Sequence, residues 1–258
     1  MRHSTIYTIL FATLVCVVCG VMVSGAAVSL KEKQQFNAEL DKRKRVLEAV
    51  GIAQPGEELT VEEVEQAFER IEAVVIDRKT GELVPSIDPA TFDARKERVD
   101  PAASEPAPQN QAGLTRVADH AEVYLVRNDA GEVEMLVLPI EGVGLWGMMY
   151  GFLALDSDLQ TVRGITYYEH KETPGLGGEV DNPRWKSFWP GRKIFQEGEV
   201  ALSVIKGPAP PPEENPYVVD GLSGATFTAR GVTYMIRFWL GENGLGPFLE
   251  RFRAREIT

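Results

Sequence analysis

The run DGLSGATFT, residues 220–228, lies directly before a stretch that has the apolar spacing of a helix. Apolar side chains recur at i, i+3, i+4 and i+7 over residues 232–239, which predicts an amphipathic helix over residues 226–240. Thr226 then stands at the exposed start of that helix. The first backbone amides of a helix have no partner within it and carry partial positive charge, so they can hold a phosphate. The Thr226 hydroxyl is therefore a candidate phosphate anchor. The alternative is an ordinary N-cap at Ser223 or Thr226.

A second unusual run, ETPGLGG, occupies residues 172–178, about fifty residues earlier. Proline fixes one φ angle, whereas the three glycines permit conformations that other residues avoid. This composition predicts a tight loop whose backbone can approach a flat ligand closely, with a plain turn as the alternative. The run has neither the spacing of a nucleotide P-loop nor that of a dinucleotide fold.

Together, and in this order, the two runs resemble the flavin motifs of the extracytoplasmic FMN-binding domains. In that family the last threonine of the SGAT stretch, here Thr226, carries FMN through a phosphoester bond, and the glycine-rich loop lines the isoalloxazine ring. The resemblance implies FMN as a covalent cofactor, attached by a separate flavin transferase that uses FAD and magnesium. Because the Asp220 carboxylate would repel a bound phosphate, we assign Asp220 to recognition during attachment. The cofactor-binding residues that it implies are Thr226 for the bond, Ser223, Gly224 and Ala225 at the phosphate, Glu172, Thr173 and Leu176 at the ring, and Trp146 and Lys206 as further candidates.

A longer stretch narrows the resemblance. Residues 145–180 read LWGMMYGFLALDSDLQTVRGITYYEHKETPGLGGEV, which is similar to the C-subunit family of sodium-translocating NADH:quinone reductases. This resemblance implies an electron-carrying member of a membrane complex that oxidises NADH, reduces ubiquinone and exports sodium, with the other subunits as partners. Two alternatives remain open: the G-subunit of the Rnf ferredoxin:NAD complex, which shares both motifs, and a membrane-tethered scaffold without flavin. The chain has no nicotinamide-binding fingerprint, so by itself it is not expected to oxidise NADH.

The N-terminal residues predict a membrane anchor. Residues 5–30 contain no Asp, Glu, Lys or Arg, which exceeds the run of about 20 apolar residues that a helix needs to cross a bilayer. The small residues 24–27 would suit a cleaved signal peptide, but the hydrophobic region of such a peptide is usually only about 7 to 15 residues long. The count of flanking lysines and arginines favours a cytoplasmic domain. The family resemblance implies instead a flavin domain on the periplasmic side of the bacterial inner membrane, and we expect this second placement.

Composition excludes several other functions. The formal net charge of −11 disfavours nucleic acid as a partner. Both cysteines, Cys16 and Cys19, lie in the hydrophobic segment, where cysteine packs as a small apolar residue. With three histidines in the whole chain, a histidine metal site is not expected, and no catalytic residue is predicted.

The remaining pattern predicts an α+β fold. The predicted domains are an anchor over residues 1–30, a helical stalk and lobe with a linker over 31–112, and an FMN-binding domain over 113–258. In the lobe, Thr60 and Glu63 form a capping box for a helix whose apolar stripe runs from Val61 to Ile71. The run 101–113 has linker composition. The other predicted elements are a hairpin of residues 121–128 and 133–137, a second strand pair at 150–155 and 160–168, a short helix after Asn182, a strand at 199–206 and a proline-rich loop at 207–216.

Overall fold

The computed structural model describes residues 4–254 and divides the chain into two compact units at residue 42. Residues 1–3, where the predicted anchor begins, and residues 255–258 lie outside the described residues. Helix α1 (Thr5–Ala49) runs through the end of the first unit, so that residues 43–49 belong to the second. The domain boundaries at residues 30 and 112 stay predictions.

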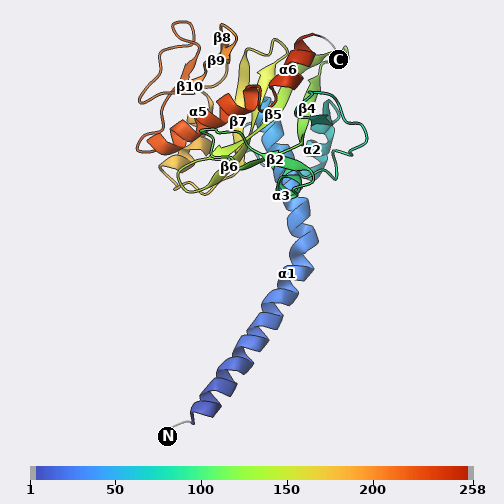
Figure 1. The fold of residues 1–258 in the computed structure, drawn as a ribbon, viewed down its shortest axis with the longest axis vertical. Helices are drawn as coiled ribbons and strands as arrows, with labels where there is room; N and C mark the ends of the chain where they lie inside the picture. The colour runs from blue at the N-terminus through green and yellow to red at the C-terminus, as the bar shows by residue number, and fades with distance from the viewer. Residues whose placement is uncertain (1–3, 255–258) are drawn as a thin grey trace. The chain divides into compact units, whose positions relative to one another are not determined.

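The first unit consists of the part of α1 up to residue 42 (Figure 1). Its most apolar 18-residue window has a mean hydropathy of 2.6, and no residue of this window is buried. By length and composition this helix can cross a membrane, as the sequence predicts. Cys16 and Cys19 are exposed free thiols on it.

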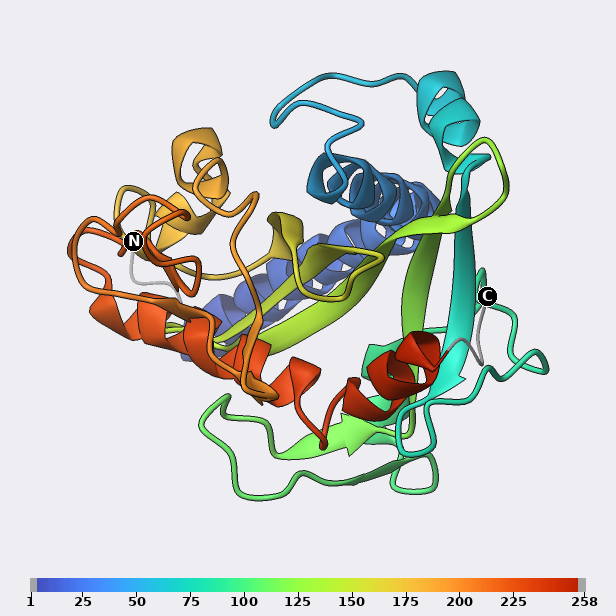
Figure 2. The ribbon, with the colours of Figure 1, turned by 90° about the horizontal axis from the view of Figure 1, so that it is seen from above.

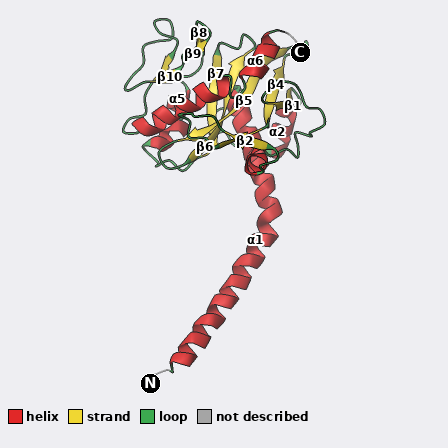
Figure 3. Cartoon of the chain, viewed as in Figure 1, coloured by secondary structure: helices red, strands yellow, loops and turns green. Residues whose placement is uncertain are grey.

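A five-stranded antiparallel sheet forms the centre of the second unit, with the strand order β1-β4-β5-β6-β7. Four of these strands follow one another along the chain as a meander (Figure 3). Asn128 and Gly131, which has a φ of +81°, form the turn between β4 and β5, so the predicted hairpin is confirmed. The strands are β1 (Ile71–Asp77), β4 (His120–Arg127), β5 (Val133–Val143), β6 (Met148–Asp156) and β7 (Val162–Glu169).

Both faces of the sheet are covered, and β7 shows how. Thr166 donates its hydroxyl hydrogen to the carbonyl of Arg45 at the end of α1, whereas Tyr167 donates to Met235 Sδ on α5 (Thr226–Leu240). Successive side chains of a strand point to opposite faces, so α5 and residues 43–49 lie on opposite sides of the sheet (Figure 2). This double cover explains why Met149 to Leu155 are all buried, without the polar alternation of a half-exposed strand.

The N-terminal part of the second unit differs from the prediction in two places. Helix α2 (Val61–Phe68) begins with the predicted capping box of Thr60 and Glu63, but Ile71, assigned to its apolar stripe, starts strand β1. The predicted linker contains strand β2 (Ser104–Pro106), which pairs with β3 (Arg116–Ala118). Helix α3 (Ala94–Val99) precedes this pair.

The C-terminal part contains shorter elements. Asn182 caps the predicted short helix, α4 (Pro183–Lys186), and a 3-10 helix, η1 (Gly177–Asp181), precedes it. The single strand predicted over 199–206 is wrong, because the chain there pairs with two different partners. Its first part, β9 (Glu199–Val200), pairs with β8 (Phe195–Gln196), and its second part, β10 (Ser203–Val204), pairs in parallel with β11 (Val218–Val219). Helix α6 (Gly246–Arg253) follows α5.

Candidate cofactor site

Helix α5 begins at Thr226, and its first turn is open. The helix has the predicted bounds, and its N-cap is Ala225, which has no side chain to accept a hydrogen bond from the first amides. The alternative of an ordinary cap at Ser223 or Thr226 is therefore wrong. Thr226, Ser223 and Gly224 are exposed, whereas Ala225 is buried against the core. The helix start has the free amides and the exposed hydroxyl that a phosphoester at Thr226 requires.

Three chain segments meet at this helix start. They are the loop 143–147 between β5 and β6, the glycine-rich loop 172–178 after β7, and the first turns of α5. Gly231 lies directly on the first loop: a Cβ there would be 3.2 Å from Gly144 Cα. Gly224, with a φ of +71°, faces Leu176 so closely that a Cβ would come within 2.9 Å of it. The predicted motifs are thus brought together, although about fifty residues separate them in sequence.

Glu172 joins all three segments. Its side chain is buried, and its Oε1 accepts hydrogen bonds of 2.9 Å from the backbone amides of Leu145 and Trp146. Its Oε2 accepts the hydroxyl hydrogen of Thr228, on α5. Both carboxylate oxygens already have partners within the protein. Contact between Glu172 and a flavin ring therefore remains a prediction. No sequence motif signalled the link to Thr228.

Exposed apolar side chains surround the open helix start. Trp146 and Phe227 are each 64% exposed, and Leu176 is 45% exposed. Isolated exposed apolar residues are common, but a group of them beside one loop cluster is typical of a surface that a ligand or partner covers. We call this group the apolar patch. Its members are Val143, Leu145, Trp146, Leu176 and Phe227.

The two other predicted residues, Thr173 and Lys206, lie on the glycine-rich loop and on the segment after β10. Thr173 is exposed, and its carbonyl closes the glycine-rich loop by accepting from the amides of Leu176 and Gly178. Lys206 is exposed and follows β10 closely, next to Gly207, whose carbonyl accepts from the Gly221 amide at 2.8 Å.

Asp220 stands at the start of the motif and is already bound within the protein. Its carboxylate accepts from the Ala209 amide at 3.1 Å, and its carbonyl accepts from the Trp185 indole at 2.9 Å. Both contacts fix the start of the motif against the proline-rich loop and α4. A role of Asp220 in recognition by a transferase stays a prediction.

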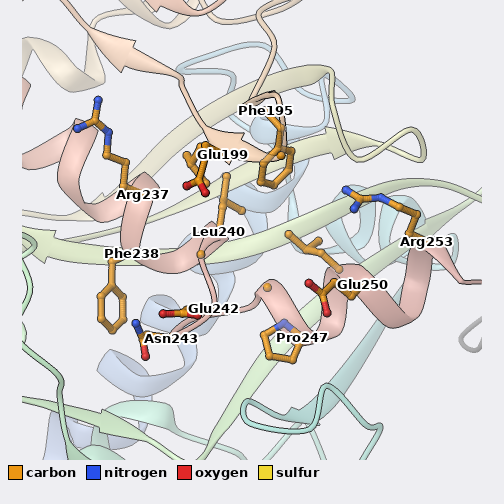
Figure 4. Close-up of a pocket in the computed structure, with 15 residues that line it drawn as sticks. Phe195, Glu199, Arg237, Phe238, Leu240, Glu242, Asn243, Pro247, Glu250 and Arg253 are labelled. Atoms are coloured by element: carbon orange, nitrogen blue, oxygen red, sulfur yellow. The ribbon is translucent and has the colours of Figure 1, made fainter.

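A cavity of about 800 Å³ lies elsewhere, between β9, the end of α5 and α6. Figure 4 shows Glu199, Arg237 and Glu250 among the residues around it. None of the predicted site residues lines it. Among residues 4–254, no group of three or more His, Cys, Asp or Glu side chains is placed to hold a metal ion.

Known proteins share the part of the sequence that contains these motifs. A family model described as "FMN-binding domain" matches residues 144–241, which include the glycine-rich loop, the run 220–228 and the whole of α5. The C-subunit of the Na(+)-translocating NADH-quinone reductase of Yersinia pestis is 49% identical, over 95% of this chain and 92% of that protein. The chain belongs to this C-subunit family, NqrC. The Pseudomonas aeruginosa member is 44% identical, over 99% of this chain and 98% of its own length.

Solved structures of NqrC proteins share the fold. The crystal structure of Shewanella oneidensis NqrC superposes with a TM-score of 0.76 at 32% identity, and covers 83% of this chain and 99% of that one. The corresponding protein of Parabacteroides distasonis gives a TM-score of 0.63 at 28% identity, over 85% and 96% of the two chains. The expected α+β architecture of the family is therefore confirmed.

His170 adds a titratable group to the glycine-rich loop. Its Nε2 lies 2.8 Å from Oδ2 of Asp181, and its Nδ1 accepts the amide hydrogen of Glu172 at 3.1 Å. The hydrogen bond with Asp181 raises the pKa of His170 above its ordinary value of 6.5, although burial opposes the shift. This pair was not predicted from sequence, because the two residues are eleven positions apart.

We expect Asp181→Asn to lower the pKa of His170, as measured by NMR titration of its ring proton. A raised pKa stabilises the fold fully below the unfolded value of 6.5, and this contribution disappears as pH rises through the folded value. Asp181→Asn should therefore lose more unfolding free energy at about pH 6 than at about pH 8.5. Glu179→Gln, at a neighbouring acid, is the control. A wild-type midpoint at or below 6.5 would contradict this assignment.

Proposed function

We propose that this chain carries FMN, esterified to Thr226, and relays electrons within the Na(+)-translocating NADH:quinone reductase. The observation that carries this proposal is the position of Thr226: an exposed hydroxyl at the first residue of a helix whose N-cap residue offers no side-chain acceptor. Family membership and the match of residues 144–241 to FMN-binding domains support it.

The residues around Thr226 suit the two ends of FMN. Amides at the start of α5 can donate to phosphate oxygens, and the helix dipole favours the negative charge there. Gly224 and Ala225 present little side chain that would obstruct a phosphate. The apolar patch offers the kind of surface that a flat aromatic ring covers. Thr173, on the same loop as Leu176, supplies a polar group beside it, and Lys206 remains a further candidate.

The bound FMN would supply one-electron and two-electron transfer, which is chemistry that protein side chains do not provide. The protein's part is to hold the flavin at one place, since electron transfer falls steeply with distance. A covalent bond to Thr226 prevents loss of the flavin, and the fixed loops around α5 limit its orientation. A separate flavin transferase, using FAD and magnesium, would make the bond.

Other steps are assigned to partner subunits. The chain has no nicotinamide-binding fingerprint, and the described residues hold one helix that can span a membrane. We therefore place NADH oxidation, ubiquinone reduction and most of the sodium path in the other subunits. We place the second unit, with the flavin, on the periplasmic side of the inner membrane. The high identity to NqrC proteins over nearly the whole chain favours this function over the Rnf alternative.

The experiment that tests the proposal is intact-mass measurement of the purified chain, expressed with and without the flavin transferase. With the transferase, the mass should increase by that of FMN less one water, because the FMN part of FAD is transferred to the Thr226 hydroxyl and AMP leaves. Without it, the mass should match the polypeptide alone. A chain that gains no such mass in the presence of an active transferase would support the scaffold alternative instead.

A further inference from the structure

Glu172 differs in its surroundings from the partly buried acids Glu48 and Glu141. Glu48 pairs with Lys186 and Glu141 pairs with Arg98, at 3.3 and 2.6 Å. In contrast, Glu172 makes no ion pair within the described part of the chain, and its partners are two backbone amides and one hydroxyl. A buried carboxylate without a cation is costly unless hydrogen bonds satisfy it fully. Such a group is seldom retained for stability alone.

The surrounding chain is shaped to the carboxylate. A Cβ at Gly144 would lie only 2.5 Å from Oε1. A Cβ at Gly177 would lie closer than 3.0 Å to both Oε2 and the Thr228 hydroxyl oxygen, which is closer than Cβ atoms are found to such neighbours. Glycine at both positions therefore leaves the room that the side chain occupies. The two amides require an acceptor at Oε1, whereas the Thr228 hydroxyl, which donates to Oε2 here, can also accept. Glutamine can keep its oxygen on the two amides and donate its amide hydrogen to the Thr228 hydroxyl, so it removes the charge but not the contacts, whereas alanine removes both.

The three groups that donate to Glu172 lie in the two parts of the proposed flavin site, the apolar patch and the start of α5. Leu145 and Trp146 are members of the apolar patch, and Thr228 lies two residues after Thr226 in the first turn of α5. If the carboxylate were lost, the loop 143–147 and this turn would lose their common link. The negative charge would also leave the vicinity of the attachment residue.

We propose that Glu172 is a positioning residue: its carboxylate fixes the apolar patch relative to the Thr226 turn, and its charge lowers the reduction potential of a flavin held there. The inference about potential rests on the proposed function, whereas the positioning role does not. A fixed negative charge opposes the negative charge that a flavin gains on reduction. The fixed geometry acts through Leu145, Trp146 and Thr228 rather than by direct contact.

The positioning role is tested by amide hydrogen exchange of the full chain without flavin, in detergent. The Leu145 and Trp146 amides, although on a partly exposed loop, should exchange slowly in the wild type and at least about tenfold faster in Glu172→Ala, which removes their acceptor. Glu179→Gln, an acid of the same region that bonds to Asn182, should leave both amides unchanged. If Glu172→Ala does not fold, Thr228→Val should speed the exchange and Thr228→Ser should not. Equal exchange in all variants would overturn the proposal.

The charge role is tested on the flavin-loaded chain by spectroelectrochemical titration. Glu172→Gln keeps Thr226, so it should still carry flavin, and its midpoint potential should be more positive than that of the wild type. Glu179→Gln should keep the wild-type potential. An unchanged potential in folded, flavin-loaded Glu172→Gln would refute the charge role. Absence of flavin from the wild type itself would refute the proposed function and leave the exchange result to decide on positioning.

Discussion

Thr226→Val should leave the chain without any flavin that survives denaturation. Valine has nearly the same shape as threonine but no hydroxyl, so no phosphoester can form at this position. Thr226 is exposed, and the cap of α5 is Ala225, so the lost hydroxyl stabilises nothing else in the helix start. We expect the unfolding free energy to change by no more than about 0.5 kcal/mol, as for other surface substitutions. The measurement is in-gel flavin fluorescence after SDS electrophoresis of chain coexpressed with the transferase.

The matched control for this prediction is Ser223→Ala, which removes the other exposed hydroxyl of the SGAT run. It should keep the fluorescent band, because Ser223 lies outside the helix and its proposed role is limited to a phosphate contact. A band that persists in Thr226→Val would show that another residue carries the flavin. Loss of the band in Ser223→Ala but not in Thr226→Val would move the attachment to Ser223.

Helix α5, the hairpin turn and the cap of α4 could be predicted from sequence, because residues close in the chain determine them. The bounds of α5 follow from its apolar period and from the small residues before it, and the structure places its start at Thr226 as predicted. The hairpin turn at Gly131 and the cap at Asn182 are likewise local, because a positive φ or an exposed amide selects the residue type there. The position of the candidate attachment residue could therefore be inferred from sequence.

Elements held by distant partners could not be inferred in this way. Strand β1 continues the apolar spacing of α2 closely enough that Ile71 fitted a helical stripe, and what makes it a strand is pairing with β4, where Ile71 lies opposite Val126. The run 199–206 has the composition of one strand, yet it is divided because β10 pairs with β11, near the flavin motif. Tertiary pairing overrides local propensity in both cases.

The same distinction applies within the site. The family resemblance placed Glu172 at the flavin ring, and its immediate neighbours in sequence indicated only a tight loop. Its role as a link depends on donors from Leu145, Trp146 and Thr228, which no spacing rule connects to it. The available signal was indirect: Gly144 and Gly177 are small where the carboxylate needs room, but a glycine does not show what fills the space beside it.

Gly231→Ala should destabilise the second unit and displace the start of α5. In an isolated helix, alanine in place of glycine is favourable by about 1 kcal/mol. Here the added Cβ would lie closer than 3.0 Å to the Val143 carbonyl oxygen, which is backbone. The Val143 amide bonds to the Ala112 carbonyl at 2.8 Å, so this strand end cannot easily yield. The helix must therefore move outward, and we expect a net loss of about 3 kcal/mol, as for overpacking of a well-packed interface.

Unfolding of the detergent-solubilised chain by urea, followed by tryptophan fluorescence, measures this loss. Arg230→Ala, at the exposed neighbouring position on α5, is the control and should change the unfolding free energy by no more than about 0.5 kcal/mol. Because the displaced helix carries Thr226 and Thr228 away from the loop 143–147, Gly231→Ala should also expose the Leu145 and Trp146 amides to faster exchange. A variant as stable as the wild type would mean that helix propensity outweighs the contact with Val143, and that α5 does not need to lie against this loop.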